Sequence, residues 1–142
     1  MSLFSAIAVS ASGMAAQRTR AELLVENLAN AETTRTPQGG PYRRKDAVFA
    51  AEPMAPSFGS LFESRLQEGV NIQEISVDTR EPERRYLPGH PDADRDGYVA
   101  FPRVNPAEDM VDLVGASRSF EANVAAISSV KDMIMRSLDL LK

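Results

Sequence analysis

Several residue types that carry enzyme chemistry are scarce in this chain of 142 residues. It contains no cysteine, no tryptophan and a single histidine. The lack of cysteine excludes disulfide bonds, thiol nucleophiles and metal sites built on thiolates, and one histidine leaves little imidazole for metal binding or acid–base chemistry. The sequence therefore predicts a protein that is not an enzyme and that holds no cofactor or metal.

The charge balance and the apolar stretches restrict the partners. The chain has 16 basic and 20 acidic residues and a net charge of −4, which disfavours a nucleic-acid partner bound through its phosphates. No stretch approaches the ~20 apolar residues of a membrane-spanning helix. No lysine or arginine precedes the apolar start, residues 3–16, so we interpret it as mature protein and not as a cleavable signal peptide. We expect neither nucleic acid nor a small-molecule substrate.

Proline is absent from both ends, and all nine prolines lie between residues 37 and 106. Because proline breaks a helix interior at a cost of ~3 kcal/mol, residues 1–36 and 105–142 can each form one long helix. The predicted fold is mainly α with a small β insertion. The N- and C-terminal helices pair in a coiled-coil-like unit, the helical core domain of an elongated molecule, and residues 37–104 form a short, irregular, β-rich middle segment.

Apolar residues repeat along both predicted helices at an average spacing near 3.5 residues. The N-terminal stripe includes Phe4, Ile7, Met14, Val25 and Leu28. The C-terminal stripe includes Leu113, Phe120, Val124, Ile127, Ile134, Leu138 and Leu141. From periodicity alone, a helical hairpin that closes its own core is the simpler interpretation. However, two such helices cover only a narrow seam, so we expect these residues to form an assembly interface with other chains.

Local signals predict the details of the remaining elements. Asn105 followed by Pro106, with Glu108 two residues on, indicates the start of the second helix. Strands are expected over residues 42–49, 70–77 with a one-residue slip near Gln73, and 98–101, and a short helical turn over 61–66. The basic triplet of residues 43–45 is interpreted as a solvated edge strand, with a binding patch as the alternative.

The best candidate for chemistry is the acidic loop of residues 90–98. Asp92, Asp94 and Asp96, followed by Gly97, match the first half of a calcium loop. The second half fails, because Arg103 occupies the position where calcium needs a bidentate glutamate. A polar turn held by Asx-type hydrogen bonds is the favoured interpretation, and a small calcium-binding or adaptor module is the alternative. No catalytic constellation is found.

The motifs themselves resemble those of bacterial flagellar rod and hook proteins. The N-terminal signature of that family is matched by residues 10–18, 26–31 and 33–36. Residues 39–45, 88–99 and 104–112 narrow the resemblance to basal-body rod proteins of the proximal rod, and residues 120–124 resemble the C-terminal motif of the family. The motif residues singled out are Asn27, Asn30, Gly39, Gly40, Tyr42 and Asn123.

This resemblance implies a structural subunit of the flagellar proximal rod, the drive shaft that crosses the periplasm. Terminal helices of such subunits assemble into a helical tube that transmits torque. The implied partners are other copies of the chain, other flagellar rod proteins, the flagellar type III export apparatus and the rod cap protein. The resemblance does not decide whether a membrane ring or a bushing ring is a further partner. The implied location is the basal-body rod, reached by export without a cleavable signal peptide.

Two pairs of residues receive expected roles within this picture. Asn27 and Asn30 are expected to end the first helix and fix its exit, with a hydrogen bond between subunits as the alternative. Gly13 and Gly115 lie inside the helices, where glycine costs ~1 kcal/mol relative to alanine. Close approach of another backbone and simple tolerance at a surface position are equally good explanations of these glycines.

Overall fold

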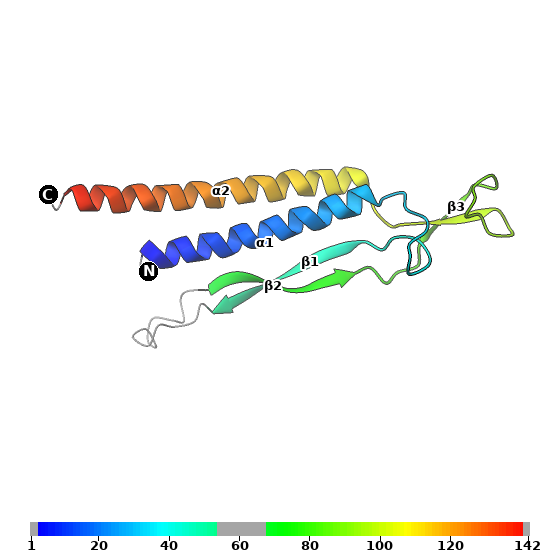
Figure 1. Ribbon diagram of the computed structural model, residues 1–142, viewed down its shortest axis with the longest axis horizontal. Helices are drawn as coiled ribbons and strands as arrows, with labels where there is room; N and C mark the ends of the chain where they lie inside the picture. Colours follow the sequence, from blue (N-terminus) through cyan, green and yellow to red (C-terminus); the bar gives the residue numbers. More distant parts are fainter. Residues whose placement is uncertain (1–2, 54–67, 141–142) are drawn as a thin grey trace.

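The computed structural model describes residues 3–53 and 68–140 of the chain (Figure 1). Its elements are α1 (Leu3–Ala29), β1 (Lys45–Pro53), β2 (Glu68–Val77), β3 (Glu83–Tyr86), β4 (Tyr98–Phe101) and α2 (Pro106–Asp139). Two long terminal helices with a small β insertion between them confirm the predicted fold class. The predicted helical turn at residues 61–66 and the stripe residue Leu141 lie outside the described residues.

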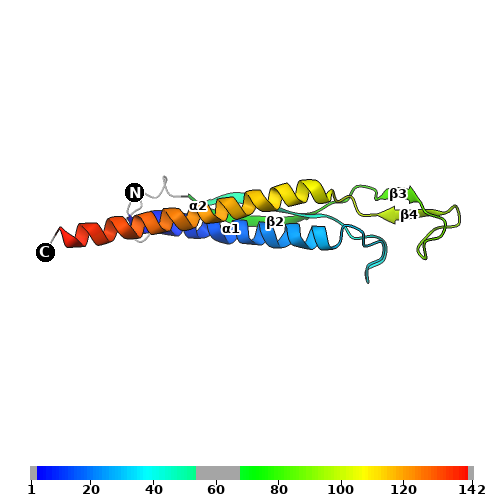
Figure 2. The ribbon, with the colours of Figure 1, turned by 90° about the horizontal axis from the view of Figure 1, so that it is seen from above.

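The two helices run antiparallel and give the molecule its elongated shape (Figures 1 and 2). α2 has 34 residues and α1 has 27, and the C-terminal part of α2 extends past the start of α1. The absence of proline permits a helix up to residue 36, but α1 ends at Ala29, seven residues earlier. None of the helices in the described ranges is both long and apolar enough to cross a membrane.

Capping residues define the helix ends that meet at one end of the molecule. The Asn105 side chain accepts a hydrogen bond of 3.2 Å from the backbone N–H of Ala107, which confirms the predicted start of α2. At the end of α1, the Asn30 side-chain amide donates to the Glu26 carbonyl over 2.9 Å and satisfies one of the last helical acceptors. Asn30 therefore has the expected place at the helix end.

The middle segment forms two separate antiparallel hairpins, β1–β2 and β3–β4. In the first, Val48 pairs with Glu74 and Phe49 with Ile72, so Gln73 is the extra residue of a bulge and the predicted slip is confirmed. The strand predicted over residues 42–49 instead covers 45–53, because the preceding residues turn and Pro53 still pairs with Glu68. β4 coincides with its prediction, whereas its partner β3 was not predicted.

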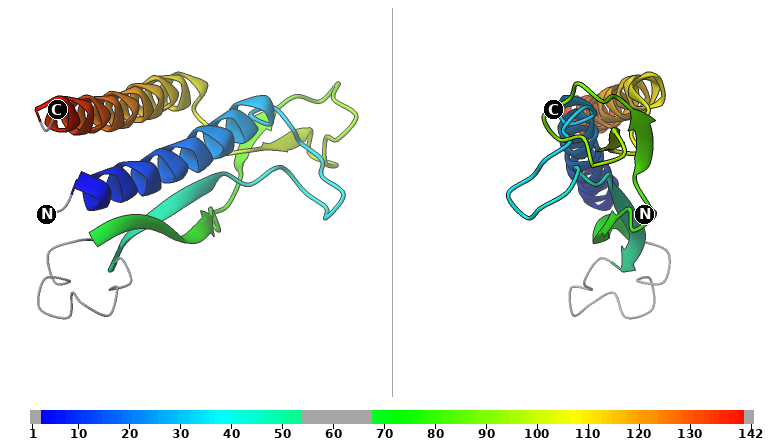
Figure 3. Two further views of the ribbon diagram at one scale, coloured as in Figure 1. Left: turned by 60° about the vertical axis from the view of Figure 1, so that its left-hand side comes forward. Right: turned by 90° about the vertical axis from the view of Figure 1, so that its right-hand side faces the viewer.

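The layers place α1 between α2 and the β1–β2 hairpin along the length of the molecule (Figures 1 and 3). The β3–β4 hairpin lies beyond the helices, at the end where α1 stops and α2 starts (Figure 2). The core is correspondingly small. Its buried apolar residues are Ala16, Leu23, Leu24, Tyr42, Val99, Phe101, Ala116 and Val130.

Candidate assembly surface

The predicted stripe of α1 faces away from the chain's own core. Ile7 and Val25 each lie nine residues from the buried Ala16, which is about two and a half helical turns and therefore the opposite side of the helix. Phe4 is 76% exposed and Val25 51% exposed, whereas Ile7, Met14 and Leu28 are half-buried. Phe4 and Val25 therefore form apolar surface on α1 that the described part of the chain leaves uncovered, whereas the other three stripe residues are partly covered.

The predicted stripe of α2 flanks the contact with α1. Leu113, Phe120, Ile127 and Ile134 are half-buried, and Val124 and Leu138 are 46% and 53% exposed. Further exposed apolar residues, which sequence reasoning missed, lie on other sides of α2 or on its extension past α1. They are Val111, Val114, Met133, Met135 and Leu140. None of the described stripe residues on either helix is fully buried, so the whole set borders solvent in a single chain.

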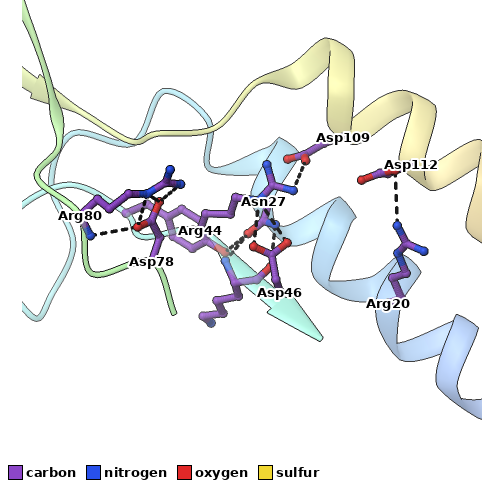
Figure 4. A network of polar contacts seen from close by, with 10 residues as sticks. Arg20, Asn27, Arg44, Asp46, Asp78, Arg80, Asp109 and Asp112 are labelled. Atoms are coloured by element: carbon purple, nitrogen blue, oxygen red, sulfur yellow. Dashed lines mark hydrogen bonds and ion pairs between the residues drawn. The ribbon is translucent and has the colours of Figure 1, made fainter. Parts of the chain in front are cut away.

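A polar junction holds the helix pair to the first hairpin at the end of α1. Asn27 is fully buried, and its side-chain oxygen accepts hydrogen bonds from the Tyr42 hydroxyl (2.9 Å) and the Lys45 N–H (2.9 Å). Its amide donates to the Lys45 carbonyl over 2.8 Å (Figure 4). Asn27 is not the residue at which α1 ends, because the helix continues to Ala29; its side chain instead joins α1 to the start of β1 inside one chain.

The protonation of Tyr42 is fixed by the same junction. Burial of the ring, followed by the nearby Glu26 carboxylate, raises the pKa of Tyr42 to about 12. The hydroxyl therefore keeps its proton at neutral pH and remains a donor to Asn27.

Arg44, which directly precedes β1, contacts a buried acid in the first turn of α2. Its guanidinium lies 3.1 Å from Asp46 and 3.1 Å from Asp109, whose side chain is 0% exposed (Figure 4). Neither oxygen of Asp109 accepts a hydrogen bond of good geometry within the described residues, so proximity to Arg44 is its main compensation. Burial raises the pKa of Asp109, and Arg44 opposes that rise.

This arrangement corrects the interpretation of the basic triplet as a solvated edge. The Arg43 guanidinium donates to the Asp78 carbonyl, Arg44 is 19% exposed between two acids, and Lys45 forms an ion pair with Glu26. Sequence reasoning missed Asp109, because an aspartate in a first helical turn is ordinarily an exposed complement to the helix dipole. No local signal marks its burial.

The acidic loop is a hydrogen-bonded turn. The Asp94 carboxylate accepts from the backbone N–H groups of Asp96 (3.0 Å) and Tyr98 (2.8 Å), which confirms the Asx-type interpretation. Asp92 accepts from the Thr34 hydroxyl over 2.8 Å and lies 3.7 Å from Arg35. Within residues 3–53 and 68–140, no group of three or more acidic or histidine side chains is placed to hold a metal ion. Nothing supports the calcium-module alternative.

Comparison with known proteins adds a decisive observation. The family described as flagellar basal body rod FlgEFG protein C-terminal matches residues 95–140. The flagellar basal-body rod protein FlgC of Borreliella burgdorferi is 40% identical over 151 residues, covering 100% of this chain and 99% of the relative. FlgC of Bacillus subtilis is 39% identical with 100% of both chains covered, and FlgC of Salmonella typhimurium is 36% identical with 99% and 98% covered. The chain belongs to the FlgC family.

Motif residues of this FlgC-family chain lie where its segments meet. A Cβ atom built on Gly13 would lie 3.1 Å from the side-chain nitrogen of Asn123, so the N- and C-terminal motifs touch across the helix pair. Gly115 has open space around its Cβ position. The two interior glycines therefore differ: close approach explains Gly13, although the approaching group is a side chain and not a backbone.

The Gly39–Gly40 turn explains how Tyr42 reaches the junction. Both glycines have positive φ angles, +88° and +75°, which side-chain-bearing residues rarely adopt. The Thr36 N–H donates to the Gly40 carbonyl over 2.8 Å, and the Tyr42 N–H donates to the Thr33 carbonyl over 3.0 Å. The turn thus folds the chain back so that the Tyr42 hydroxyl meets Asn27.

Proposed function

We propose that this chain is a structural, non-enzymatic subunit of the flagellar basal-body rod that assembles through the outward faces of its terminal helices. The observation that carries the proposal is the uncovered apolar face of α1 in a chain that matches rod proteins over its full length. Burial of apolar surface contributes ~25 cal/mol per Å², so contact with neighbouring subunits would stabilise these helices strongly.

Contacts between these helix faces would transmit torque from one subunit to the next. A drive shaft needs no reacting group; it needs many tightly packed contacts between subunits that resist sliding. Stripe residues on both helices border solvent along the helix pair, from Phe4 at the start of α1 to Leu113 near the start of α2. We infer that residues 1–36 and 105–142 form the assembling core, and that residues 37–104 form the peripheral part of each subunit.

The resemblance to flagellar axial proteins supports the finer assignments. They are a place in the proximal rod within the periplasm, export through the flagellar type III apparatus, and assembly under a rod cap protein beside other copies and other rod proteins. A membrane ring or bushing ring would face the peripheral part.

Val25→Asp tests the assembly face. Because Val25 is 51% exposed, its replacement should leave the chain folded, whereas an aspartate buried between subunits costs several kcal/mol. The variant is produced in cells from which the gene for this chain has been deleted. We expect isolated basal bodies to contain at least about tenfold less of the variant than of the wild-type chain, a factor that corresponds to ~1.4 kcal/mol. Motility should be lost, and the secreted amount should stay at the wild-type level.

Val25→Ile is the matched control, because it keeps an apolar surface at the same position. Normal incorporation is expected. If Val25→Asp also assembles normally, the outward face of α1 is not the interface, and if the wild-type chain is missing from isolated basal bodies, the rod assignment itself fails.

A further inference from the structure

A small basic cavity lies between the β3–β4 hairpin and the rest of the molecule. Its volume is about 70 Å³, which is room for a few water molecules or one carboxylate group. Its charged lining consists of Arg43, Arg44, Asp78, Arg80 and Arg103. Four arginines against one aspartate give +4 − 1 = +3 in a chain whose net charge is −4. We call this cavity the arginine pocket.

Two of these arginines form no ion pair within the described residues, although the charge of Arg103 helps to lower the pKa of Asp78 and of Glu83. Arg80 is held by Asp78, and Arg44 lies between Asp46 and Asp109 (Figure 4). Arg43 reaches only a backbone carbonyl, and Arg103 is exposed with no ion pair or hydrogen bond within the described residues. Guanidinium groups bind carboxylates through paired N–H donors, so Arg43 and Arg103 leave this capacity unused.

The internal acid of the pocket cannot neutralise it. Hydrogen bonds from Arg80 lower the pKa of Asp78 to about 2, so this carboxylate is ionised at neutral pH and already engaged by Arg80. A neighbouring hollow also contains Glu83 and Glu108, of which Glu83 is paired with Arg85. Arg43 and Arg103 therefore carry the positive charge that no ion pair offsets, and Glu108, which also forms no ion pair within the described residues, lines the neighbouring hollow together with Arg103.

The walls of the pocket are conformationally restricted. Pro41, Pro82 and Pro102 line it, each with a φ angle fixed by its ring, together with the Gly39–Gly40 turn. The lining comes from three separate loops, at residues 39–44, 78–82 and 102–103. The restricted proline backbones reduce the conformational entropy that the walls lose when a ligand enters, whereas the exposed Arg43 and Arg103 side chains still have to be ordered.

We propose that the arginine pocket receives the carboxylate of an aspartate or glutamate from a neighbouring rod subunit, bound by Arg43 and Arg103. This inference rests on the proposed function. Neighbouring copies have suitable groups, because Glu121 and Asp132 on α2 are exposed and form no ion pair within the described residues. Such a contact would fix the register of adjacent subunits, since charge pairs at an interface specify orientation more than affinity.

Arg103→Glu tests the pocket, because the new glutamate would face the acidic side chain of the neighbouring subunit and repel it. In cells from which the gene for this chain has been deleted, isolated basal bodies should contain at least about tenfold less of the variant than of the wild-type chain. Arg103→Lys, which keeps the charge, should retain most of the incorporation. Arg95→Glu is the matched control, because Arg95 is exposed, lies outside the pocket and has no ion pair within the described residues. It should incorporate normally.

Selection for motile revertants of Arg103→Glu identifies the partner. We expect substitutions that turn an acidic residue outside the pocket, in this chain or another rod protein, into a neutral or basic one. Any of three results would overturn the proposal: Arg103→Glu is incorporated as well as the wild type, Arg95→Glu is incorporated as poorly as Arg103→Glu, or the substitutions in the revertants are confined to Glu83 and Glu108. So would a lower unfolding temperature of purified Arg103→Glu than of Arg95→Glu, because it would assign Arg103 a role within the fold. Absence of the wild-type chain from basal bodies would instead contradict the proposed function.

Discussion

The two ends of the helix pair are stabilised in different ways. Where α1 ends and α2 begins, buried polar groups of the same chain bind one another, with Asn27 and Asp109 at the centre. At the other end, no residue of α1 before Ala16 and no described residue of α2 after Val130 is fully buried. The junction is thus completed within one chain, whereas the free end has apolar surface that the described part of the chain leaves uncovered.

Asn27→Leu should produce the largest effect at the junction. It removes three hydrogen bonds and leaves the Tyr42 hydroxyl and the Lys45 backbone without their partner. Unpaired buried polar groups cost ~1–3 kcal/mol each, so we expect a loss of about 3 kcal/mol or more in the free energy of unfolding. Urea unfolding followed by circular dichroism measures this loss.

Phe4→Ala is the corresponding change at the free end. Because Phe4 is 76% exposed, its loss should alter the unfolding free energy of the isolated chain by only about 0.5 kcal/mol. Similar losses for Asn27→Leu and Phe4→Ala would contradict the distinction between the two ends.

Asp109→Asn should make the stability of the junction less dependent on pH. Because burial raises the folded-state pKa of Asp109 above its ordinary value of 3.8, folding favours the protonated acid. Wild-type stability should therefore fall, relative to that of Asp109→Asn, as the pH rises from 3.8 through the folded-state pKa, and the difference should then level off.

Urea unfolding of both variants between about pH 3 and 7 measures this difference. The lowered pKa of Asp78 destabilises both proteins equally when the pH falls from its ordinary 3.8 towards about 2, so it cancels in the comparison. A difference that does not change with pH would show that Asp109 is not desolvated in the folded chain.

Elements specified by their own residues could be predicted from the sequence. The absence of proline permitted the two helices, Asn105 and Pro106 marked the start of α2, and the broken alternation near Gln73 revealed the bulge. In contrast, β3 has the sequence Glu83–Tyr86, which is mostly charged and lies between two prolines, and it becomes a strand only by pairing with β4. Its stability comes from that partner and not from local preference.

The candidate surface was only partly predictable for a similar reason. A helical period identifies an apolar face, but it does not tell whether that face meets the same chain or another one. Both stripes contain exposed and half-buried positions, with Val25 exposed on α1 and Leu113 and Phe120 half-buried on α2. The Arg44–Asp109 pair joins residues 65 positions apart, so no spacing rule could have found it.

The two glycines within the helices should respond differently to replacement by alanine. Gly115→Ala should stabilise the chain by about 1 kcal/mol, because alanine favours a helix and its methyl group meets open space. Gly13→Ala should bring no such gain. Its methyl group would lie 3.1 Å from the Asn123 side-chain nitrogen, and that amide already donates to the Ser119 carbonyl over 3.0 Å. Displacing the amide would offset the gain in helix propensity.

Thermal unfolding of the two variants, with the double variant Gly13→Ala/Asn123→Ala as control, tests whether this contact is the cause. Removing the Asn123 amide should make room for the methyl group, so Gly13→Ala should be more favourable in the Asn123→Ala background than in the wild type. If Gly13→Ala stabilises the wild-type chain as much as Gly115→Ala does, the two helices do not approach closely at Gly13.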